Sequence, residues 1–279
     1  MTDTSLILQE QNVSNAFSRQ SSVFDDIYEN NPITLIIRQK ARNEVLGHIS
    51  PGDHILELNC GTGIDTMFFA GKGFKVMATD NAGGMLQKLS EKIAGSPKER
   101  LVSVRKCSFN DLTPLHDHRY DYIFSNFGGL NCTSDLASVL KQVDQLLKPG
   151  GHFTFVLMPK ICPWEIASIF KGRQKVAFRR FKKAGTNAHI EGVYFKCYYY
   201  SPSYFRKHIP VGYARCSLKG MASFMPPPFM DHFPVKYPKL FSMLKHIEDK
   251  VCDKFPFNRW CDQYVITMRK GLPARRESV

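Results

Sequence analysis

Apolar side chains recur at helical spacing in the first fifty residues. Residues 12–29 and 32–49 each predict a helix. The apolar stripe of the second helix consists of Leu35, Ile36, Val45, Leu46 and Ile49. Pro32 suits the start of that helix, because its missing N–H would have no partner in the first turn. The Pro-Gly-Asp sequence at residues 51–53 then ends the helical pattern.

From residue 54 the period changes, and short apolar runs alternate with helical stretches. The runs predict five strands, at residues 54–59, 74–79, 101–107, 120–125 and 152–158. The stretches between them predict helices, at residues 65–71, 85–94 and 134–147. Strands that alternate with helices of about ten residues are typical of a parallel sheet with right-handed crossovers. We therefore expect a doubly wound α/β core over residues 51–158.

The alternation lapses after Pro159. We expect a basic helix over residues 164–183, aromatic-rich strands over 192–200 and a further helix that starts at Ser201. Two more strands are predicted at 213–219 and 263–269, with a helix over 238–254 between them. The tail from Gly271 is expected to be disordered.

Composition narrows the class of protein. The chain has 279 residues, of which 43% are hydrophobic and 23% are charged, as in an average soluble globular protein. No apolar run approaches the roughly 18 residues needed to cross a bilayer, and the N-terminus resembles no secretory signal. Eight cysteines form no Cys-x-x-Cys pair, so we expect reduced thiols, no metal site and a cytoplasmic protein. The net charge of +13 is compatible with nucleic acid, an acidic membrane surface or an anionic substrate, and does not choose among them.

The turn after the first strand of the core contains the residues that indicate ligand binding. Gly61 and Gly63 follow the first strand of the core, where a backbone without Cβ atoms lets a ligand approach closely. Asp80 ends the second strand, where a carboxylate can hold two ribose hydroxyls. A dinucleotide fits less well than a cationic nucleoside, because Thr66 replaces the third glycine of the dinucleotide fingerprint and Asp65 would repel a pyrophosphate at the helix N-terminus. Adenosine that carries a sulfonium and an ammonium group is such a cationic ligand.

The sequence from Glu57 to Gly63, Glu-Leu-Asn-Cys-Gly-Thr-Gly, resembles the first motif of class I S-adenosylmethionine-dependent methyltransferases. The resemblance covers residues 51–158 and extends more weakly to residues 23–28, which look like the lid motif of the small-molecule members. It implies a mostly parallel, seven-stranded, Rossmann-like sheet with an N-terminal helical lid (1–50), the cofactor-binding core (51–158) and the final strands and helix that complete the core (213–279). The resemblance does not assign residues 159–200. Their basic and aromatic side chains lead us to expect a substrate cap inserted after the fifth strand (159–212).

The resemblance also implies a cofactor site for S-adenosylmethionine, position by position. Three residues would hold the methionine end: Glu57, Gly61 and Gly63. Asp80 would hold the ribose, with Asn81 and Met85 beside the adenosine. The adenine edge would be met by residues after the third strand: Asn110, Asp111 and Leu112. Three residues after the fourth strand would lie beneath the methyl donor: Ser125, Asn126 and Phe127. Asp111 could instead merely cap the next helix.

The acceptor is less constrained by sequence. The apolar and cationic side chains after residue 159 favour a medium-sized, partly hydrophobic small molecule and are compatible with an anionic one. We expect O-methylation first and leave carbon or nitrogen open. Candidate general bases are Tyr28, His189 and Tyr198, although a lone histidine or a tyrosine stripe usually serves packing. Seven cations within residues 171–183 leave an alternative, a nucleic-acid methyltransferase. A second alternative is a non-catalytic nucleoside-binding module. The oligomeric state is left open.

Overall fold

The computed structural model describes residues 3–272, so most of the tail predicted to be disordered lies outside the described residues. The N-terminal segment forms helices α1 (Asp3–Gln20), α2 (Phe24–Glu29) and α3 (Pro32–Leu46). The predicted helix over 12–29 is therefore wrong in its bounds, because a turn at residues 21–23 separates α1 from α2. Asn31 begins α3, and its Oδ1 accepts hydrogen bonds from the backbone N–H groups of Ile33 and Thr34, both at 3.0 Å.

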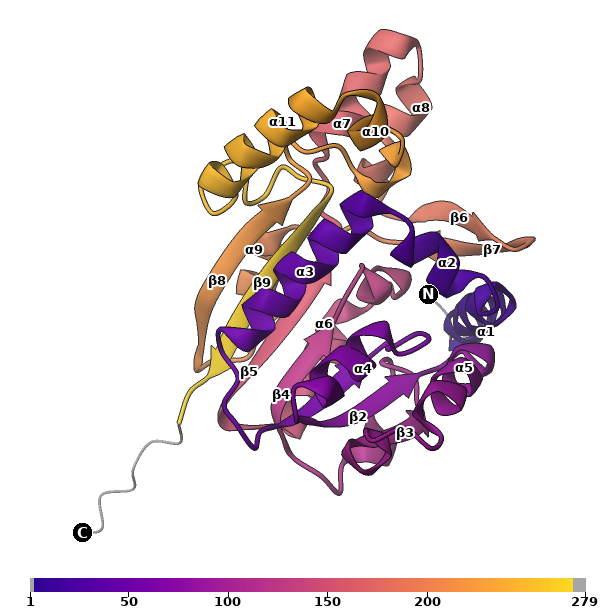
Figure 1. Cartoon of the computed structure of the whole chain (residues 1–279), viewed down its shortest axis with the longest axis vertical. Helices are drawn as coiled ribbons and strands as arrows, with labels where there is room; N and C mark the ends of the chain where they lie inside the picture. Colours follow the sequence, from indigo (N-terminus) through magenta and orange to yellow (C-terminus); the bar gives the residue numbers. More distant parts are fainter. Residues whose placement is uncertain (1–2, 273–279) are drawn as a thin grey trace.

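A single seven-stranded sheet forms the centre of the molecule, in the order β3-β2-β1-β4-β5-β9-β8 (Figure 1). Its strands are β1 (His54–Leu58), β2 (Lys75–Asp80), β3 (Val102–Lys106), β4 (Tyr120–Ser125), β5 (Leu147–Leu157), β8 (Tyr213–Met221) and β9 (Gln263–Lys270). The first five strands pair in parallel, and β9 is antiparallel to both β5 and β8. The predicted mostly parallel, Rossmann-like sheet is confirmed.

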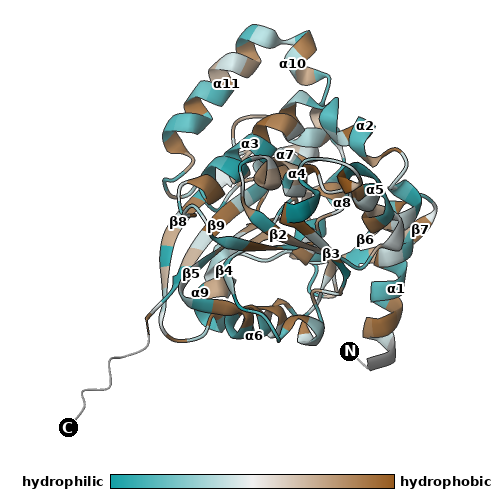
Figure 2. Cartoon of the chain, turned by 60° about the horizontal axis from the view of Figure 1, so that its bottom comes forward, coloured by the Kyte–Doolittle hydropathy of each residue, from teal (hydrophilic) through white to brown (hydrophobic). Residues whose placement is uncertain are grey.

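Helices cover both faces of the sheet (Figure 2). One face packs against α3, α4 (Ile64–Gly71) and α5 (Gly83–Ile93), and the other against α6 (Leu136–Leu146) and α9 (Pro202–His208). Because the central strands are buried on both sides, they are apolar along their length, as β4 shows with Tyr120, Tyr122, Ile123 and Phe124 fully buried. No helix of the described residues is long and apolar enough to cross a membrane.

The predicted single basic helix over 164–183, in the segment after β5, is wrong. The segment forms four short pieces instead: α7 (Pro163–Ile166), the 3-10 helix η4 (Ala167–Lys171), α8 (Gln174–Ala177) and the 3-10 helix η5 (Arg179–Phe181). Arg180 is buried between the carboxylates of Glu165 and Asp262, at 2.7 Å and 2.6 Å, and a buried guanidinium must be paired in this way. A straight helix with a solvated basic face could not fold back to make both ion pairs.

The aromatic-rich strands also differ from the prediction over 192–200. They are β6 (Thr186–Ile190) and β7 (Val193–Cys197), a separate two-stranded antiparallel sheet. Figure 1 shows this hairpin beside α1, and Gln9 of α1 joins them by accepting from the N–H of Lys196 and donating to its carbonyl oxygen. The N-terminal helix is thereby fixed to the segment that follows β5.

The remaining elements cover the edge of the sheet and the connections. They are the helices α10 (Phe233–Lys236) and α11 (Pro238–Val251) and the short 3-10 helices η1 (Glu99–Leu101), η2 (Thr113–Leu115), η3 (Gly129–Cys132) and η6 (Pro228–Met230). Glu248 of α11 is fully buried and accepts hydrogen bonds from the N–H groups of Ala222, Ser223 and Met225. This carboxylate secures the extended loop that follows β8.

Candidate functional site

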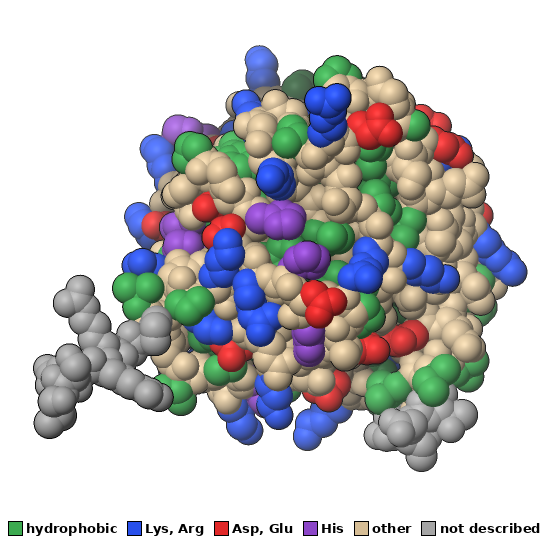
Figure 3. All heavy atoms as spheres, turned by 90° about the horizontal axis from the view of Figure 1, so that it is seen from below, with side chains coloured by type: hydrophobic (Ala, Val, Ile, Leu, Met, Phe, Trp, Pro, Cys, Tyr) green, Lys and Arg blue, Asp and Glu red, His purple; other side chains and the backbone are tan. Residues whose placement is uncertain are grey.

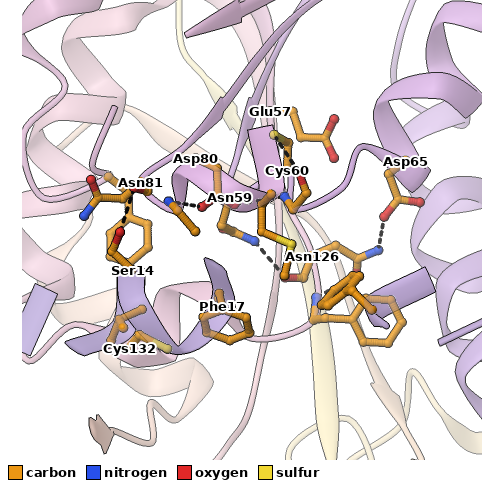
Figure 4. A pocket seen from close by; sticks show the side chains of 18 of the residues that line it. Ser14, Phe17, Glu57, Asn59, Cys60, Asp65, Asp80, Asn81, Asn126 and Cys132 are labelled. Carbon is orange, nitrogen blue, oxygen red and sulfur yellow. Dashed lines mark hydrogen bonds between the residues drawn. The ribbon is translucent and has the colours of Figure 1, made fainter. Parts of the chain in front are cut away.

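A pocket lies at the carboxyl ends of the central parallel strands, where open α/β sheets bind ligands (Figure 4). Its floor comes from the loops after β1, β2, β3 and β4, and its cover comes from α1, α2 and α3. In Figure 4, Glu57 and Asp65 lie on one side of the pocket, and Asp80, Asn81 and Ser14 lie on the other. The pocket therefore has two chemically distinct ends.

The glycine turn brings backbone and carboxylate together. Gly61 has φ +57 and lines the pocket, and its N–H donates to Asp80 Oδ2 at 2.9 Å. Asp80 Oδ1 accepts from the N–H of Ala82 at 2.8 Å. Burial raises the pKa of Asp80, while these backbone donors oppose the rise. Asp80 is thus a positioned carboxylate at the tip of β2, as expected for a ribose contact.

Gly63 has a different role from Gly61. It also has positive φ, at +80, but a Cβ at this position would lie 2.2 Å from Leu89 Cδ1 of α5. The requirement for glycine therefore comes from the close packing of the turn against α5, and Gly63 is not among the residues that line the pocket.

Three charged side chains meet at the other end of the pocket. Asp65 is paired with Arg38 at 2.5 Å and with Arg42 at 2.7 Å, and Asn126 donates to it at 2.9 Å. The inference that Asp65 would repel a pyrophosphate is therefore wrong, because two guanidinium groups neutralise its charge. Sequence spacing could not reveal this pairing, since both arginines come from α3, before the core begins.

Glu57 lies beside this ion pair without a cation of its own. Its side chain is fully buried, and its Oε2 accepts from the hydroxyl of Thr66 at 2.5 Å. Burial and the nearby charge of Asp65 raise the pKa of Glu57 to about 8, against the opposing effects of Thr66 and the two arginines. The raised pKa favours the protonated carboxyl group, and a cation bound beside it would lower that pKa and stabilise the carboxylate.

An aromatic wall closes the pocket near Asn126. Phe24 and Tyr28 of α2 stack at a centroid distance of 4.2 Å, and Tyr28 meets the edge of Phe127 at 5.9 Å. The guanidinium of Arg38 lies over the Phe127 ring at 4.5 Å. Burial raises the pKa of Tyr28, so its hydroxyl stays protonated near neutral pH. The wall can exclude water, and its one hydroxyl is a donor rather than a base.

The structure brings most of the predicted site residues to the pocket, but not all. Those that line it are Tyr28, Glu57, Gly61, Asp80, Asn81, Met85, Asn110, Asn126 and Phe127. Those that do not are Gly63, Asp111, Leu112, Ser125, His189 and Tyr198. Ser125 lies behind the wall and donates to Asn59 Oδ1 at 2.5 Å. His189 is exposed on β6 against Tyr194, and Tyr198 is buried in the core on the α6 side of the sheet.

Of the three residues expected at the adenine edge, Asn110 lines the pocket, whereas Asp111 and Leu112 do not. Asp111 is exposed and accepts from the N–H of Thr113 at 3.1 Å, two residues on, as in an Asx turn. Leu112 is buried in the core. The residues after β3 that do line the pocket are Ser108, Phe109 and Asn110.

Further lining residues were missed by sequence reasoning. The main ones are Glu10, Val13, Ser14 and Phe17 of α1, Phe24 of α2 and Arg38 of α3. Their only sequence signal is the amphipathic pattern of an N-terminal helix, which equally predicts packing against a core. Only the tertiary contact between these helices and the strand ends distinguishes the two roles.

Two clusters of potential metal ligands occur among the described residues, although none was expected. Cys162, Glu165 and Asp262 surround the guanidinium of Arg180, which already neutralises the carboxylates. The other cluster consists of His48, His152 and Cys216. Figure 3 shows histidines among lysines and arginines on the face seen from below. Neither cluster lies in the pocket.

A family model described as a methyltransferase domain matches residues 55–151. A demethylmenaquinone methyltransferase from Symbiobacterium thermophilum is 34% identical over 38% of this chain and 43% of its own length. A malonyl-[acyl-carrier protein] O-methyltransferase from Serratia marcescens is 28% identical over 56% of each chain. The chain thus spans about half the length of these curated relatives. Among solved structures, the DhpI–SAH complex superposes with a TM-score of 0.57 at 15% identity, over 97% of this chain and 99% of that one.

The sheet order, the glycine turn and the matched family model agree. Residues 55–151 form a class I, S-adenosylmethionine-dependent methyltransferase domain, and the class predicted from sequence is confirmed. The solved structures extend the likeness of fold to nearly the whole chain.

Proposed function

We propose that the protein transfers a methyl group from S-adenosylmethionine to a small-molecule acceptor. The observation that carries this proposal is the pocket itself, in which Asp80, held by the N–H of Gly61, lies at one end and the buried Glu57 at the other. A nucleoside with a cationic amino-acid tail matches this order of groups. The cofactor, when bound, supplies a methyl group on a positively charged sulfur.

The residues at the charged end suit an amino-acid tail with both signs of charge. Glu57 would hold the ammonium group, because its carboxyl is buried and lacks a cation of its own. Arg38 would hold the carboxylate, since it is the one lysine or arginine among the described residues that line the pocket. Its pairing with Asp65 fixes the guanidinium in place before any ligand binds. At the other end, Asp80 would accept the ribose hydroxyls.

The remaining lining residues would orient the acceptor and keep water out. Methyl transfer by in-line displacement mostly requires orientation and exclusion of water. Phe24, Tyr28 and Phe127 provide a closed aromatic surface for both purposes. Because the lining residues form an apolar and aromatic enclosure, we infer a partly hydrophobic acceptor of medium size.

The chemistry of the lining favours an acceptor that arrives already ionised. The described residues of the pocket include no histidine or lysine, and Tyr28 holds its proton near neutral pH. The four carboxyl groups that line it are each held by hydrogen bonds or ion pairs from the protein: Glu10, Glu57, Asp65 and Asp80. A neutral alcohol would need a general base to lose its proton, whereas a carboxylate or an acidic hydroxyl would not. We therefore propose O-methylation of an acidic, partly hydrophobic small molecule. The malonyl-[acyl-carrier protein] O-methyltransferase among the relatives is consistent with an acidic acceptor.

Calorimetric titration with S-adenosylhomocysteine tests the cofactor, with NAD as the matched control. The expected result is that S-adenosylhomocysteine binds in the micromolar range and NAD does not bind. Asp80→Asn should weaken the binding of S-adenosylhomocysteine, whereas Asp117→Asn, at an exposed residue, should leave it unchanged. The proposal fails if the folded protein binds no S-adenosylhomocysteine. Binding without methyl transfer to any acceptor would favour the non-catalytic module.

A panel of acceptors with labelled methyl donor tests the substrate class. The panel should contain hydrophobic carboxylic acids, phenols and total RNA. Alkali releases label as methanol from a methyl ester but not from an ether or a carbon-linked methyl group, so it reports the atom that is methylated. Label on RNA that falls steeply with salt would favour the nucleic-acid alternative, for which five exposed cations remain within residues 171–183: Lys171, Arg173, Lys175, Lys182 and Lys183.

A further inference from the structure

Helix α1 places a carboxylate at the end of the pocket opposite Glu57. Glu10 lines the pocket together with Ser108 and Asn110, the residues that follow β3. Its Oε1 accepts from the hydroxyl of Ser108 at 2.8 Å and from the side-chain amide of Asn110. Asp111 faces away, as described above. Glu10 is therefore the carboxylate that the structure provides beside the loop after β3.

We infer that Glu10 recognises the amino group of the adenine base. This inference rests on the proposed function. It assigns the contact with the adenine base to helix α1, whereas the sequence-based prediction assigned it to the residues after β3. The base of an adenosine whose ribose is held by Asp80 extends along the β2–β3 edge of the sheet, where Asn81, Ser108 and Asn110 line the pocket. A carboxylate accepts from an amino group and repels the carbonyl oxygen of a deaminated base.

The hydrogen bonds of Glu10 leave acceptor capacity for a ligand. Both donors from the protein, Ser108 and Asn110, reach Oε1. No donor from the described residues contacts Oε2. A carboxylate has acceptor sites on both oxygens, so one oxygen fixes the side chain to the loop and the other can take the amino group. The other pocket carboxylates have other roles in the proposed function, since Asp80 would hold the ribose and Glu57 the ammonium group. Asp65 is paired with Arg38 and Arg42.

Helix α1 is held firmly enough to position this side chain. Gln9 donates to the carbonyl oxygens of Cys132 and Lys196, at 3.1 Å and 2.7 Å. One turn further on, Ser14 donates to the carbonyl oxygen of Asn81 at 2.9 Å. A Cβ on Gly84 of α5 would lie 2.6 Å from the carbonyl oxygen of Ser18, so the two helices touch through their backbones. The anchors flank Glu10 on both sides along the helix.

The test compares two ligands that differ only at the amino group of the base. S-adenosylhomocysteine carries the amino group, and S-inosylhomocysteine carries an oxygen in its place. The wild-type protein should prefer the first, and Glu10→Gln should lower its affinity for the first about tenfold to hundredfold, the range for a hydrogen bond to a charged group. The preference should shrink, because a glutamine amide can donate to the oxygen of the inosine base. Asp111→Asn is the matched control and should bind both ligands as the wild type does.

A second variant separates recognition from folding. Glu10→Gln combined with Ser108→Asp returns a carboxylate to the same end of the pocket, since the Ser108 hydroxyl lies 2.8 Å from Glu10. This double variant should regain preference for the adenine ligand. The inference is overturned if Glu10→Gln keeps wild-type affinity and preference, or if Asp111→Asn loses them instead. If the wild type binds neither ligand, the proposed function fails together with the inference. If the wild type binds S-adenosylhomocysteine and Glu10→Gln binds it equally well, only the inference about Glu10 fails.

Discussion

Replacing Glu57 by glutamine should stabilise the protein as the pH rises. Glu57 is fully buried and lies near the charge of Asp65, and these two causes raise its pKa from 4.5 to about 8. Glutamine has almost the same shape and carries no charge at any pH. The substitution therefore removes the pH dependence that arises because the buried carboxyl group keeps its proton while the unfolded chain releases it, and it leaves the surrounding packing in place.

The sign and size of the effect follow from the two pKa values. Below pH 4.5, Glu57 is protonated in the folded and in the unfolded state and adds no pH dependence. Between pH 4.5 and about 8, the unfolded chain has released the proton and the folded chain retains it, so the free energy of unfolding falls as pH rises. At about 1.4 kcal/mol per pH unit, the wild type should lose roughly 2.5 kcal/mol from Glu57 between about pH 5.5 and 7.5.

Urea unfolding at these two pH values measures the effect. The difference in free energy of unfolding between Glu57→Gln and the wild type should increase by roughly 2.5 kcal/mol from the lower to the higher pH. Glu91→Gln is the matched control, because Glu91 is exposed on α5 and its pKa lies below its usual value, so it is ionised in both states throughout this range. A difference that stays constant with pH for Glu57→Gln would refute the reasoning.

Three further predictions concern binding, stability and catalysis. Asp80→Asn should weaken binding of S-adenosylhomocysteine by about 1.5–3 kcal/mol in calorimetry, since a charged acceptor is lost, and unchanged affinity would contradict the ribose assignment. Arg180→Met should cost about 3–5 kcal/mol in urea unfolding because it leaves Glu165 and Asp262 buried without a cation. Arg179→Met is its control, since Arg179 is partly exposed, and an equal cost for both variants would argue against the buried ion pair. Tyr28→Phe should leave the pH profile of methyl transfer unchanged, because the raised pKa of Tyr28 keeps it from acting as a base, and a lost basic limb would show that it is one.

The core of the fold was predictable because its signals are local. Strand β4 spans Tyr120–Ser125, the same bounds that its apolar run predicts, and β1 and β2 end at the residues that lead into the glycine turn and Asp80. Burial on both faces makes such strands apolar along their whole length. The alternation with helices then leaves few topologies that satisfy right-handed crossovers.

The sequence-based predictions were wrong where a charged residue pairs with a residue that is distant in the chain. The sequence predicts Arg180 to be one cation on a solvated helix face. In the structure it is buried against Asp262, eighty-two positions later in the chain. The repulsion ascribed to Asp65 disappears because Arg38 and Arg42 of another helix pair with it. Sequence spacing shows where such charges stand along the chain but not which opposite charge they meet.

The sequence by itself determined the sheet, the glycine turn and the carboxylates Glu57 and Asp80, because each depends on residues that are near in the chain. Only the tertiary structure decided the chemistry at the two ends of the pocket. It turned Asp111 outward, brought Glu10 from α1 to the loop after β3, and left Glu57 with a raised pKa. These outcomes depend on burial and on contacts between distant segments, and electrostatic energies change most steeply with both.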